Sequence, residues 1–247
     1  MKLYDELVSW YPLLDPVEEH EEETATFRAA FEAAVRGPLT TFLELGSGAG
    51  HNAFYFRDLT CTLSDLSEPM LALSDKLNPD ADHVPGDMRS LRLGRTFDAV
   101  LVHDAITYMT TEHDLRAALE TAFVHTRPGG AAIIATDCVR ETFGPNSDIT
   151  EGDDETNARH LRCMEDMWDP DPTDTTYRVD YVFLLREGND VRVVHDHHIE
   201  GLFPLARWRA LLEEVGFEVE VVTRPLPEEE GRSVYTDKVF VCRRAET

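Results

Sequence analysis

The sequence contains only three lysines, no closely spaced pair of cysteines and no long apolar run. Its four cysteines form no C-x-x-C pair, so neither a zinc knuckle nor a disulfide framework is predicted. No stretch approaches the roughly 20 apolar residues that a membrane-spanning helix needs. The N-terminal segment carries acids where a signal peptide would be apolar. We therefore expect a cytoplasmic protein with no membrane partner.

Positive charge is also scarce. Lysine and arginine together number 23 against 48 aspartates and glutamates, which gives a net charge of −25. A surface of that sign repels a phosphate backbone, so nucleic acid is a poor candidate partner. Only three of the 23 basic residues are lysines, and this bias is compatible with a GC-rich genome or with a high-salt cytoplasm in which carboxylates keep a protein soluble. Charge does not choose between them.

The first 140 residues alternate apolar runs with helical patterns. Residues 18–36 place Phe27 and Phe31 at helical spacing behind an acidic first turn, which predicts an entry helix. The segments TTFLELGSGAG, CTLSDLS and FDAVLVHDAITYM then each read as a strand that ends in a loop before a helix. Strands that alternate with helices predict a parallel sheet with right-handed crossovers.

The pattern changes after about residue 140. Residues 144–175 are rich in Gly, Pro, Asp, Asn and Thr, which predicts a long loop or lid. Two strands follow, TTYRVDYVFLLRE and VRVVHDHHIEGLF, and the intervening GND predicts a hairpin. No long linker divides the chain, so we expect one domain in four parts. These are an N-terminal lid and entry helix (1–37), a cofactor-binding core (38–140), inserted antiparallel strands (141–200) and a C-terminal completion of the sheet (201–247).

A glycine loop follows the first predicted strand. Glu44, Gly46, Gly48 and Gly50 form the pattern E-x-G-x-G-x-G, which allows a backbone to approach a ligand closely. A plain tight turn is the alternative. The third glycine of a dinucleotide fingerprint would stand at His51, and this departure argues against a nicotinamide or flavin cofactor.

Carboxylates follow the next two predicted strands. Asp65 ends the second strand, where it can accept hydrogen bonds from both hydroxyls of a ribose. Its alternative role is a helix N-cap, but Ser67 is better placed for that role. Asp87 and Met88 follow the third strand, and an acceptor beside a polarizable side chain suits a flat base with an amino group.

Taken together, E-L-G-S-G-A-G, D-L-S-E-P-M-L, G-D-M, F-D-A-V and R-P-G-G resemble the class I S-adenosylmethionine-dependent methyltransferases over residues 40–137. The resemblance implies a Rossmann-like α/β fold, with a seven-stranded mostly parallel sheet, helices on both faces and a small inserted antiparallel sheet. It implies that S-adenosyl-L-methionine is the cofactor and S-adenosyl-L-homocysteine the product. The implied cofactor contacts are Glu44, Gly46, Ser47, Gly48, Gly50, Asn52, Asp65, Leu66, Met70, Asp87, Met88 and His103.

The inserted strands make the chain similar to small-molecule N-methyltransferases, especially those that dimethylate amino groups of nucleotide-linked deoxysugars. That similarity implies a small-molecule acceptor, an amine in a pocket roofed by the inserted strands, and it points to Tyr108 near the acceptor. The N-terminal stretch VSWYPLLDP departs from the basic, glycine-containing stretch of those enzymes.

Methyl transfer from a sulfonium is a direct displacement that depends mainly on alignment and exclusion of water. An amine must be neutral when it attacks, so we name His103, Asp104 and Tyr108 as catalytic candidates. Asp104 as a turn cap and Tyr108 as a core residue are the alternatives. The candidate substrate contacts lie in the N-terminal segment and the insertion. They are Tyr4, Tyr11, Trp168, Arg178 and His198.

No metal is predicted. His195 and His197 share one face of a strand while His198 points the other way, and none has an obvious partner ligand. A catalytically silent protein that binds S-adenosylmethionine as a regulator is the alternative function, and a dinucleotide-dependent oxidoreductase is a weaker third. A homodimer is possible.

Overall fold

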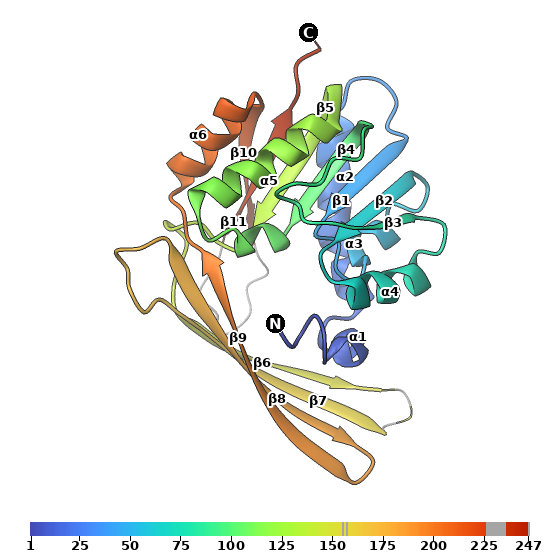
Figure 1. Ribbon diagram of the computed structural model, residues 1–247, viewed down its shortest axis with the longest axis vertical. Helices are drawn as coiled ribbons and strands as arrows, with labels where there is room; N and C mark the ends of the chain where they lie inside the picture. Colours follow the sequence, from blue (N-terminus) through green and yellow to red (C-terminus); the bar gives the residue numbers. More distant parts are fainter. Residues whose placement is uncertain (155, 157, 226–235, 247) are drawn as a thin grey trace.

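Two β-sheets organise the chain in the computed structural model, which describes residues 1–154, 156, 158–225 and 236–246 (Figure 1). The larger sheet has seven strands in the order β10-β11-β5-β4-β1-β2-β3. β11 runs antiparallel to both of its neighbours, and the remaining neighbouring pairs are parallel. The predicted mostly parallel sheet is therefore confirmed. Its strands are β1 (Thr41–Leu45), β2 (Thr60–Asp65), β3 (Asp82–Pro85), β4 (Phe97–His103), β5 (Thr126–Thr136), β10 (Glu218–Pro225) and β11 (Thr236–Arg243).

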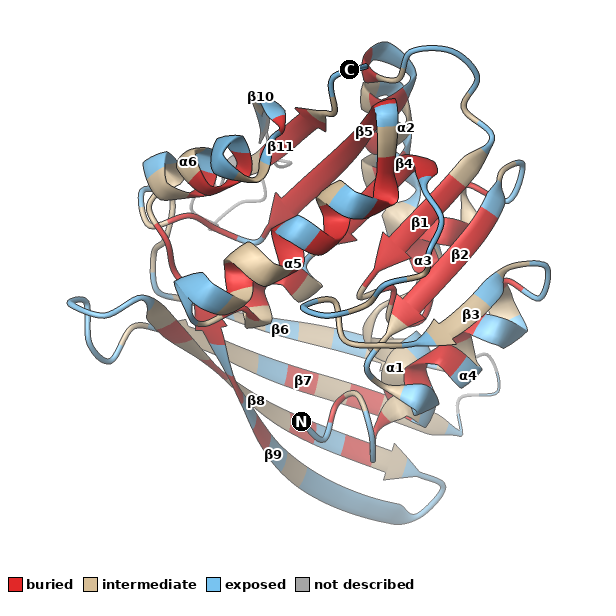
Figure 2. Cartoon of the chain, turned by 45° about the horizontal axis from the view of Figure 1, so that its top comes forward, coloured by how far each residue is buried: buried red, intermediate tan, exposed pale blue. Residues whose placement is uncertain are grey.

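Helices cover both faces of this sheet. On one face, α2 buries Phe27 and Phe31 against alternate strand residues such as Ala99 and Leu101. On the other face, α5 and α6 pack on the strand residues that alternate with these, such as Val100. The central strands β1, β2, β4 and β5 are consequently buried along most of their length, as Figure 2 shows. The helices are α1 (Tyr11–Leu14), α2 (Glu21–Ala34), α3 (His51–Phe54), α4 (Glu68–Leu77), α5 (Glu112–His125) and α6 (Leu205–Val215), and the 3₁₀ turns are η1 (Val8–Trp10), η2 (Val17–His20) and η3 (Ala105–Tyr108).

The smaller sheet is antiparallel in the order β6-β7-β8-β9. Its strands are β6 (Asn146–Asp153), β7 (Arg159–Trp168), β8 (Thr176–Glu187) and β9 (Asp190–Gly201). The GND hairpin is confirmed, because it joins β8 to β9. The long loop predicted at 144–175 is wrong over most of its length, since it contains β6 and β7. Every second residue of β6 is exposed, and this polar alternation resembles a loop in the sequence.

The inner face of the smaller sheet holds the N-terminal segment. Leu3, Leu7 and Trp10 pack against inward residues of β7 and β8, including Cys163 and Phe183. The N-terminus and α1 consequently lie between the two sheets (Figure 1). We call the smaller sheet the roof, because it covers the edge of the larger sheet at which the parallel strands end.

The outer face of the roof is exposed and partly apolar. Ile149, Met164, Leu184 and Val193 are each at least 43% exposed. The possible homodimer stays a prediction. Among the described residues, no helix is long and apolar enough to cross a membrane.

Candidate functional site

A cavity of about 1120 Å³ opens where β1, β2 and β4 end. Ligands of open α/β sheets bind at this edge, because the loops that follow the strands converge there. The cavity brings together the glycine loop, Asp65, Asp87, Met88 and residues of the N-terminal segment. Most of the predicted site residues therefore share one space.

The glycine loop has a backbone that other residues adopt with strain. Gly46, Gly48 and Gly50 all have positive φ, at 74°, 52° and 76°. A Cβ on Gly46 would lie 2.3 Å from the Cβ of Ala105, and one on Gly50 would lie 2.2 Å from Ser74 Oγ. At Gly48 the nearest atom would be 3.6 Å away, so this glycine has space on its cavity side. The first and third glycines thus allow close packing, whereas the middle one leaves room for a ligand.

Glu44 of β1 has an unpaired carboxylate oxygen. Its Oε1 accepts a hydrogen bond from Asn52 Nδ2 at 3.0 Å, but its Oε2 is buried without a partner. The side chain is 2% exposed, and burial raises the pKa of Glu44 to about 7. A buried acceptor without a donor is costly, and the amino group of a bound methionine moiety would satisfy it. The site therefore fits the cofactor that the sequence predicts.

Asp65 is held at the end of β2 by backbone amides. The amide of Gly48 donates to Oδ2 at 2.8 Å, and that of Ser67 donates to Oδ1 at 2.7 Å. Each oxygen keeps a second lone pair, so ribose hydroxyls can still donate to it. Ser67 caps α4 by accepting the Met70 amide, as predicted, and Leu66 lines the cavity beside it.

The adenine end of the predicted site has one feature that the sequence did not indicate. Arg89 contacts both carboxylate oxygens of Asp87, from Nε at 3.0 Å and from Nη2 at 2.6 Å. Its hydrogen bonds lower the pKa of Asp87. Met88 lines the cavity nearby.

His103 ends β4 between two carboxylates. Its Nε2 lies 2.9 Å from Asp104 and 3.3 Å from Glu23, and its Nδ1 lies 3.2 Å from Asn52. Burial alone would lower the pKa of His103, but the two carboxylates raise it well above its ordinary value. Asn52 Nδ2 can donate to Nδ1 only when that ring nitrogen carries no proton, so this contact fits the tautomer whose proton is on Nε2, facing the two carboxylates. Asp104 is the one non-glycine residue with positive φ among those described, at 50°.

A hydrogen-bonded chain crosses from the N-terminal segment to the roof. The hydroxyls of Tyr4 and Tyr108 are 2.9 Å apart, and Tyr108 lies 2.8 Å from His198 Nδ1. On its other side, His198 Nε2 lies 3.3 Å from Asp196, which also accepts the Leu3 amide. Burial lowers the pKa of His198 despite the nearby carboxylate. With its proton on Nε2, facing Asp196, the neutral imidazole of His198 presents Nδ1 as the acceptor for the Tyr108 hydroxyl.

Two predicted substrate contacts lie elsewhere. Trp168 and Arg178 are paired across β7 and β8 on the outer face of the roof, where both contact Asp180. Neither lines a cavity. The alternation of strand residues places them there, because the inward positions of β8 are the odd-numbered ones such as Tyr177 and Val179. His195 shares that outer face, as predicted, and also contacts Asp180.

A cluster that the sequence did not indicate lies at the other end of the cavity. Asp15 Oδ1 lies 2.7 Å from His20 Nε2, and its Oδ2 lies 3.2 Å from His51 Nδ1. Tyr11 also donates to this carboxylate at 2.9 Å. Asp15, His20 and His51 each offer one atom that could bind a metal ion, and these three atoms lie within 4.8 Å of one another. Their spacing along the chain has no metal-site pattern, so only the fold brings them together.

Comparisons with known proteins match this architecture. A family model for a methyltransferase domain matches residues 42–130, from β1 to β5. The chain is 30% identical over 188 residues to the dTDP-3-amino-3,4,6-trideoxy-alpha-D-glucopyranose N,N-dimethyltransferase of Streptomyces venezuelae, covering 73% of this chain and 76% of that one. Its fold resembles that of Streptomyces venezuelae DesVI, with a TM-score of 0.77 and 25% identity over 97% and 96% of the two chains. It also resembles SAM-bound CalS10, an amino pentose methyltransferase of Micromonospora echinaspora, with a TM-score of 0.71 and 22% identity over 91% and 90%.

Proposed function

The chain belongs to the S-adenosylmethionine-dependent methyltransferases, as its motifs predicted, and from that premise we propose that it methylates an amino group of a small molecule by direct displacement. The observation that carries this proposal is the chain Tyr4–Tyr108–His198–Asp196, which reaches the wall of the cofactor cavity. The relative from Streptomyces venezuelae, named as an N,N-dimethyltransferase of an amino sugar, supports an amine as the acceptor.

Residues of the larger sheet would hold the cofactor. When bound, S-adenosylmethionine supplies a methyl group on a positively charged sulfur, which an amine lone pair can attack. Glu44 would accept a hydrogen bond from its amino group through the unpaired Oε2. Asp65 would accept from the ribose hydroxyls, and Met88 would pack against the adenine.

The roof and the N-terminal segment would prepare the acceptor. An ammonium group has no lone pair, so it must lose a proton before it attacks. Tyr108 would take that proton while passing its own to Nδ1 of His198, and Asp196 would stabilise the imidazolium that forms. His103 has Nε2 beside Asp104 and Glu23 and Nδ1 beside Asn52, so both ring nitrogens are engaged and we assign it a positioning role rather than the role of base.

The N-terminal segment would act as a lid. Ser67 donates to the backbone carbonyl of Tyr4 at 2.5 Å, which ties the segment to the loop that follows Asp65. Leu3 and Trp10 anchor it on the roof. A lid tied on both sides would exclude water from the acceptor, which favours transfer to the amine over side reactions.

A direct test follows the release of S-adenosylhomocysteine from purified protein given cofactor and a panel of small amines, phenols and carboxylic acids. We expect release with amines, together with a mass increase of one or more methyl groups in the acceptor. Protein that binds the cofactor yet methylates none of the panel would favour the regulator instead. Methylation of phenols alone would contradict the amine assignment.

A further inference from the structure

A second, smaller cavity adjoins the cofactor cavity. It measures about 330 Å³ and lies between the ends of β4 and β5 and the inner face of the roof. Six residues line both cavities, so the smaller one opens directly beside the cofactor. They are His103, Asp104, Asp137, Glu165, Tyr181 and Glu200. If the proposed function holds, this is where an acceptor of the size of one sugar ring would lie.

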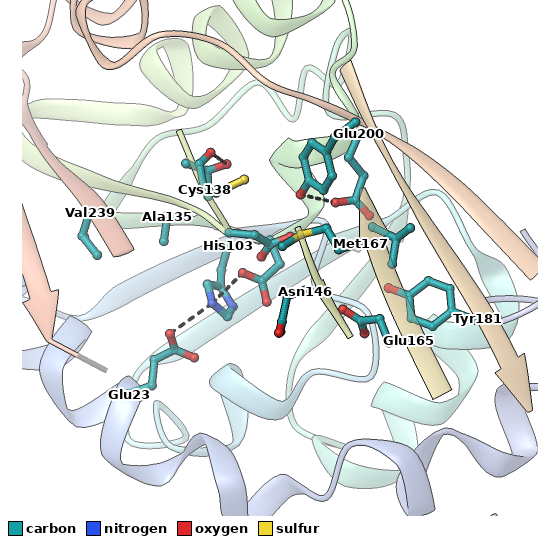
Figure 3. A pocket seen from close by; sticks show the side chains of 15 residues that line it. Glu23, His103, Ala135, Cys138, Asn146, Glu165, Met167, Tyr181, Glu200 and Val239 are labelled. Carbon is teal, nitrogen blue, oxygen red and sulfur yellow. Dashed lines mark hydrogen bonds and ion pairs between the residues drawn. The ribbon is translucent and has the colours of Figure 1, made fainter. Parts of the chain in front are cut away.

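Carboxylates dominate the lining of the smaller cavity. They come from five separate parts of the chain, namely α2, the end of β4, the end of β5, β7 and β9. They are Glu23, Asp104, Asp137, Glu165 and Glu200. Figure 3 labels the glutamates of α2, β7 and β9. His103 is the one basic side chain of the lining, and it is already paired with Glu23 and Asp104. Three carboxylates are thus left without a cationic partner among the lining residues.

The roof carboxylates have free acceptor capacity. Glu200 is only 4% exposed, and it accepts one hydrogen bond, from Tyr177 to Oε2. Its Oε1 faces no hydrogen-bond donor among the described residues. Burial raises the pKa of Glu165, and burial together with nearby negative charge raises that of Glu200 to about 7. A ligand with positive charge would relieve this repulsion and supply the lacking donors.

Surface acidity does not account for these groups. Solubilising charges lie on the outside of a protein, whereas Glu23, Glu165 and Glu200 face the same cavity from α2 and from the roof (Figure 3). Asp104 and Asp137, which also line it, are exposed. The outer face of β7 and β8 shows the contrast, because there Asp180 is paired with Arg178. The inner face of the roof carries carboxylates without a cationic partner, whereas the charges on its outer face are paired. This difference indicates that the inner face selects a ligand.

In the smaller cavity, the described lining has no cation that could bind a phosphate apart from His103, which is paired with Glu23 and Asp104. The larger cavity adds the N-terminal ammonium of Met1, together with Arg89, which is paired with Asp87, and His20 and His51, which are both paired with Asp15. A diphosphate placed beside the roof would meet negative charges without a partner.

We infer that the acceptor is a phosphate-free compound with at least two amino groups, one of which is methylated while the other binds the roof carboxylates as an ammonium. The inference rests on the proposed function. The two amino groups have different requirements, because the methylated one must be neutral and the three carboxylates without a cationic partner would keep it protonated if it were alone. A second ammonium that neutralises Glu165 and Glu200 removes that conflict. The rings of Tyr177 and Tyr181, which also line the cavity, add attraction for an ammonium.

Three probes built on one sugar ring test the inference. They are the dTDP-linked amino sugar, the methyl glycoside of the same amino sugar, and that glycoside with a second amino group. Binding to the complex of the protein with S-adenosylhomocysteine is measured by calorimetry, and methyl transfer is measured in parallel. We expect the diamine to bind about tenfold more tightly than the monoamine, and the dTDP-linked sugar to bind most weakly.

Charge-neutralising variants locate the effect. Glu165→Gln and Glu200→Gln should each weaken diamine binding about fivefold or more, with affinity for S-adenosylhomocysteine unchanged. Asp166→Asn removes the same charge from the outer face of β7, next to Glu165, and should change diamine binding less than twofold. Equal effects of Glu165→Gln and Asp166→Asn would overturn the assignment to the inner face.

The possible failures are distinguishable. Tighter binding of the dTDP-linked sugar than of the methyl glycoside would overturn the inference, and its turnover would leave the proposed amine methylation standing. Absence of binding by all three probes would also overturn the inference. Tight diamine binding without methyl transfer to any amine would instead contradict the proposed function.

Discussion

The two sheets differ in what covers them, and the difference separates a general part of the site from a particular one. The larger sheet is covered on both faces, so its strands are apolar and its polar residues gather in the loops at one edge (Figure 2). The roof is covered on one face, and that face carries Glu165 within β7 and His198 and Glu200 near the end of β9. We therefore propose that the larger sheet positions a cofactor through the loops and strand ends at that edge, whereas the roof selects an acceptor through residues within its strands.

The largest expected effect is on cofactor binding, and it should differ between a glycine of the larger sheet's loop and a glycine of the roof. Gly46→Val should abolish cofactor binding, because its Cβ would lie 2.3 Å from Ala105 and 2.8 Å from Met88. Gly188→Ala, at the hairpin of the roof, meets no atom within 4 Å and should leave cofactor affinity unchanged although its φ is also positive. Calorimetry with S-adenosylhomocysteine measures both, and circular dichroism checks that each variant folds. Equal losses in both would break the distinction between the regions.

Asp65→Ala should weaken cofactor binding by about 2 to 4 kcal/mol, since it removes an ionised acceptor from the ribose and frees the Gly48 amide. That corresponds to roughly 30-fold to 1,000-fold in the dissociation constant. Glu165→Gln, in the roof, is the matched control and should leave this constant unchanged. If the cofactor affinity of Asp65→Ala falls by less than threefold, Asp65 is not part of the cofactor site.

Tyr108→Phe should lower turnover and leave cofactor binding intact, whereas Asp65→Ala acts on cofactor binding. We expect turnover to fall about 10-fold to 1,000-fold while cofactor affinity stays within about threefold, because the variant breaks the chain to His198 without touching the glycine loop. His198→Gln should produce a loss of similar size if the two side chains act together. Full turnover in Tyr108→Phe would leave alignment alone as the source of catalysis.

The sequence allowed the larger sheet to be predicted because its apolar strands and loop motifs recur along the chain. Glu44, Asp65 and His103 each follow or end such a strand, so their convergence was predictable. β6 and β7 were not, because alternate polar residues on a half-covered sheet lack an apolar run. Without those strands, the inward direction of Glu165 could not be inferred, nor the outward direction of Trp168.

Contacts between segments that are distant in the sequence were the other feature that could not be predicted. Tyr4, Tyr108 and His198 were each named as candidates, but no spacing indicated that they form one hydrogen-bonded chain. Asp15 and His51 were missed for the same reason, since the fold alone brings a loop of the N-terminal segment to the start of α3. The order of strands and helices along the chain determines at which edge of the sheet the strand ends meet, whereas side-chain networks depend on tertiary packing.

A smaller effect concerns the stability of the protein without cofactor. The unfolded chain ionises Glu44 near its ordinary pKa of 4.5, whereas burial raises the folded pKa to about 7. The folded state thus binds the extra proton between these values, so the free energy of unfolding falls as pH rises through this window. Between pH 5.5 and 8.5 this decrease should be about 2 kcal/mol larger in the wild type than in Glu44→Gln. Urea denaturation of both proteins at the two pH values measures it, and identical pH dependences would contradict the burial of an ionisable Glu44 acceptor.

The smallest expected effect lies on the outer face of the roof. Arg178→Ala removes a side chain whose Nε and Nη2 lie 2.7 and 2.6 Å from Asp180, on the face opposite the cavities. An exposed ion pair contributes at most about 1 kcal/mol to stability, and no lining residue loses a contact. We expect kcat/KM for an amine acceptor to change less than twofold. The neighbouring inward position supplies the contrast, because Val179→Asp would add a sixth carboxylate to the smaller cavity and should alter acceptor binding. A loss of more than fivefold in Arg178→Ala would mean that acceptor recognition extends to the outer face, and the assignment of selection to the inner face of the roof would then fail.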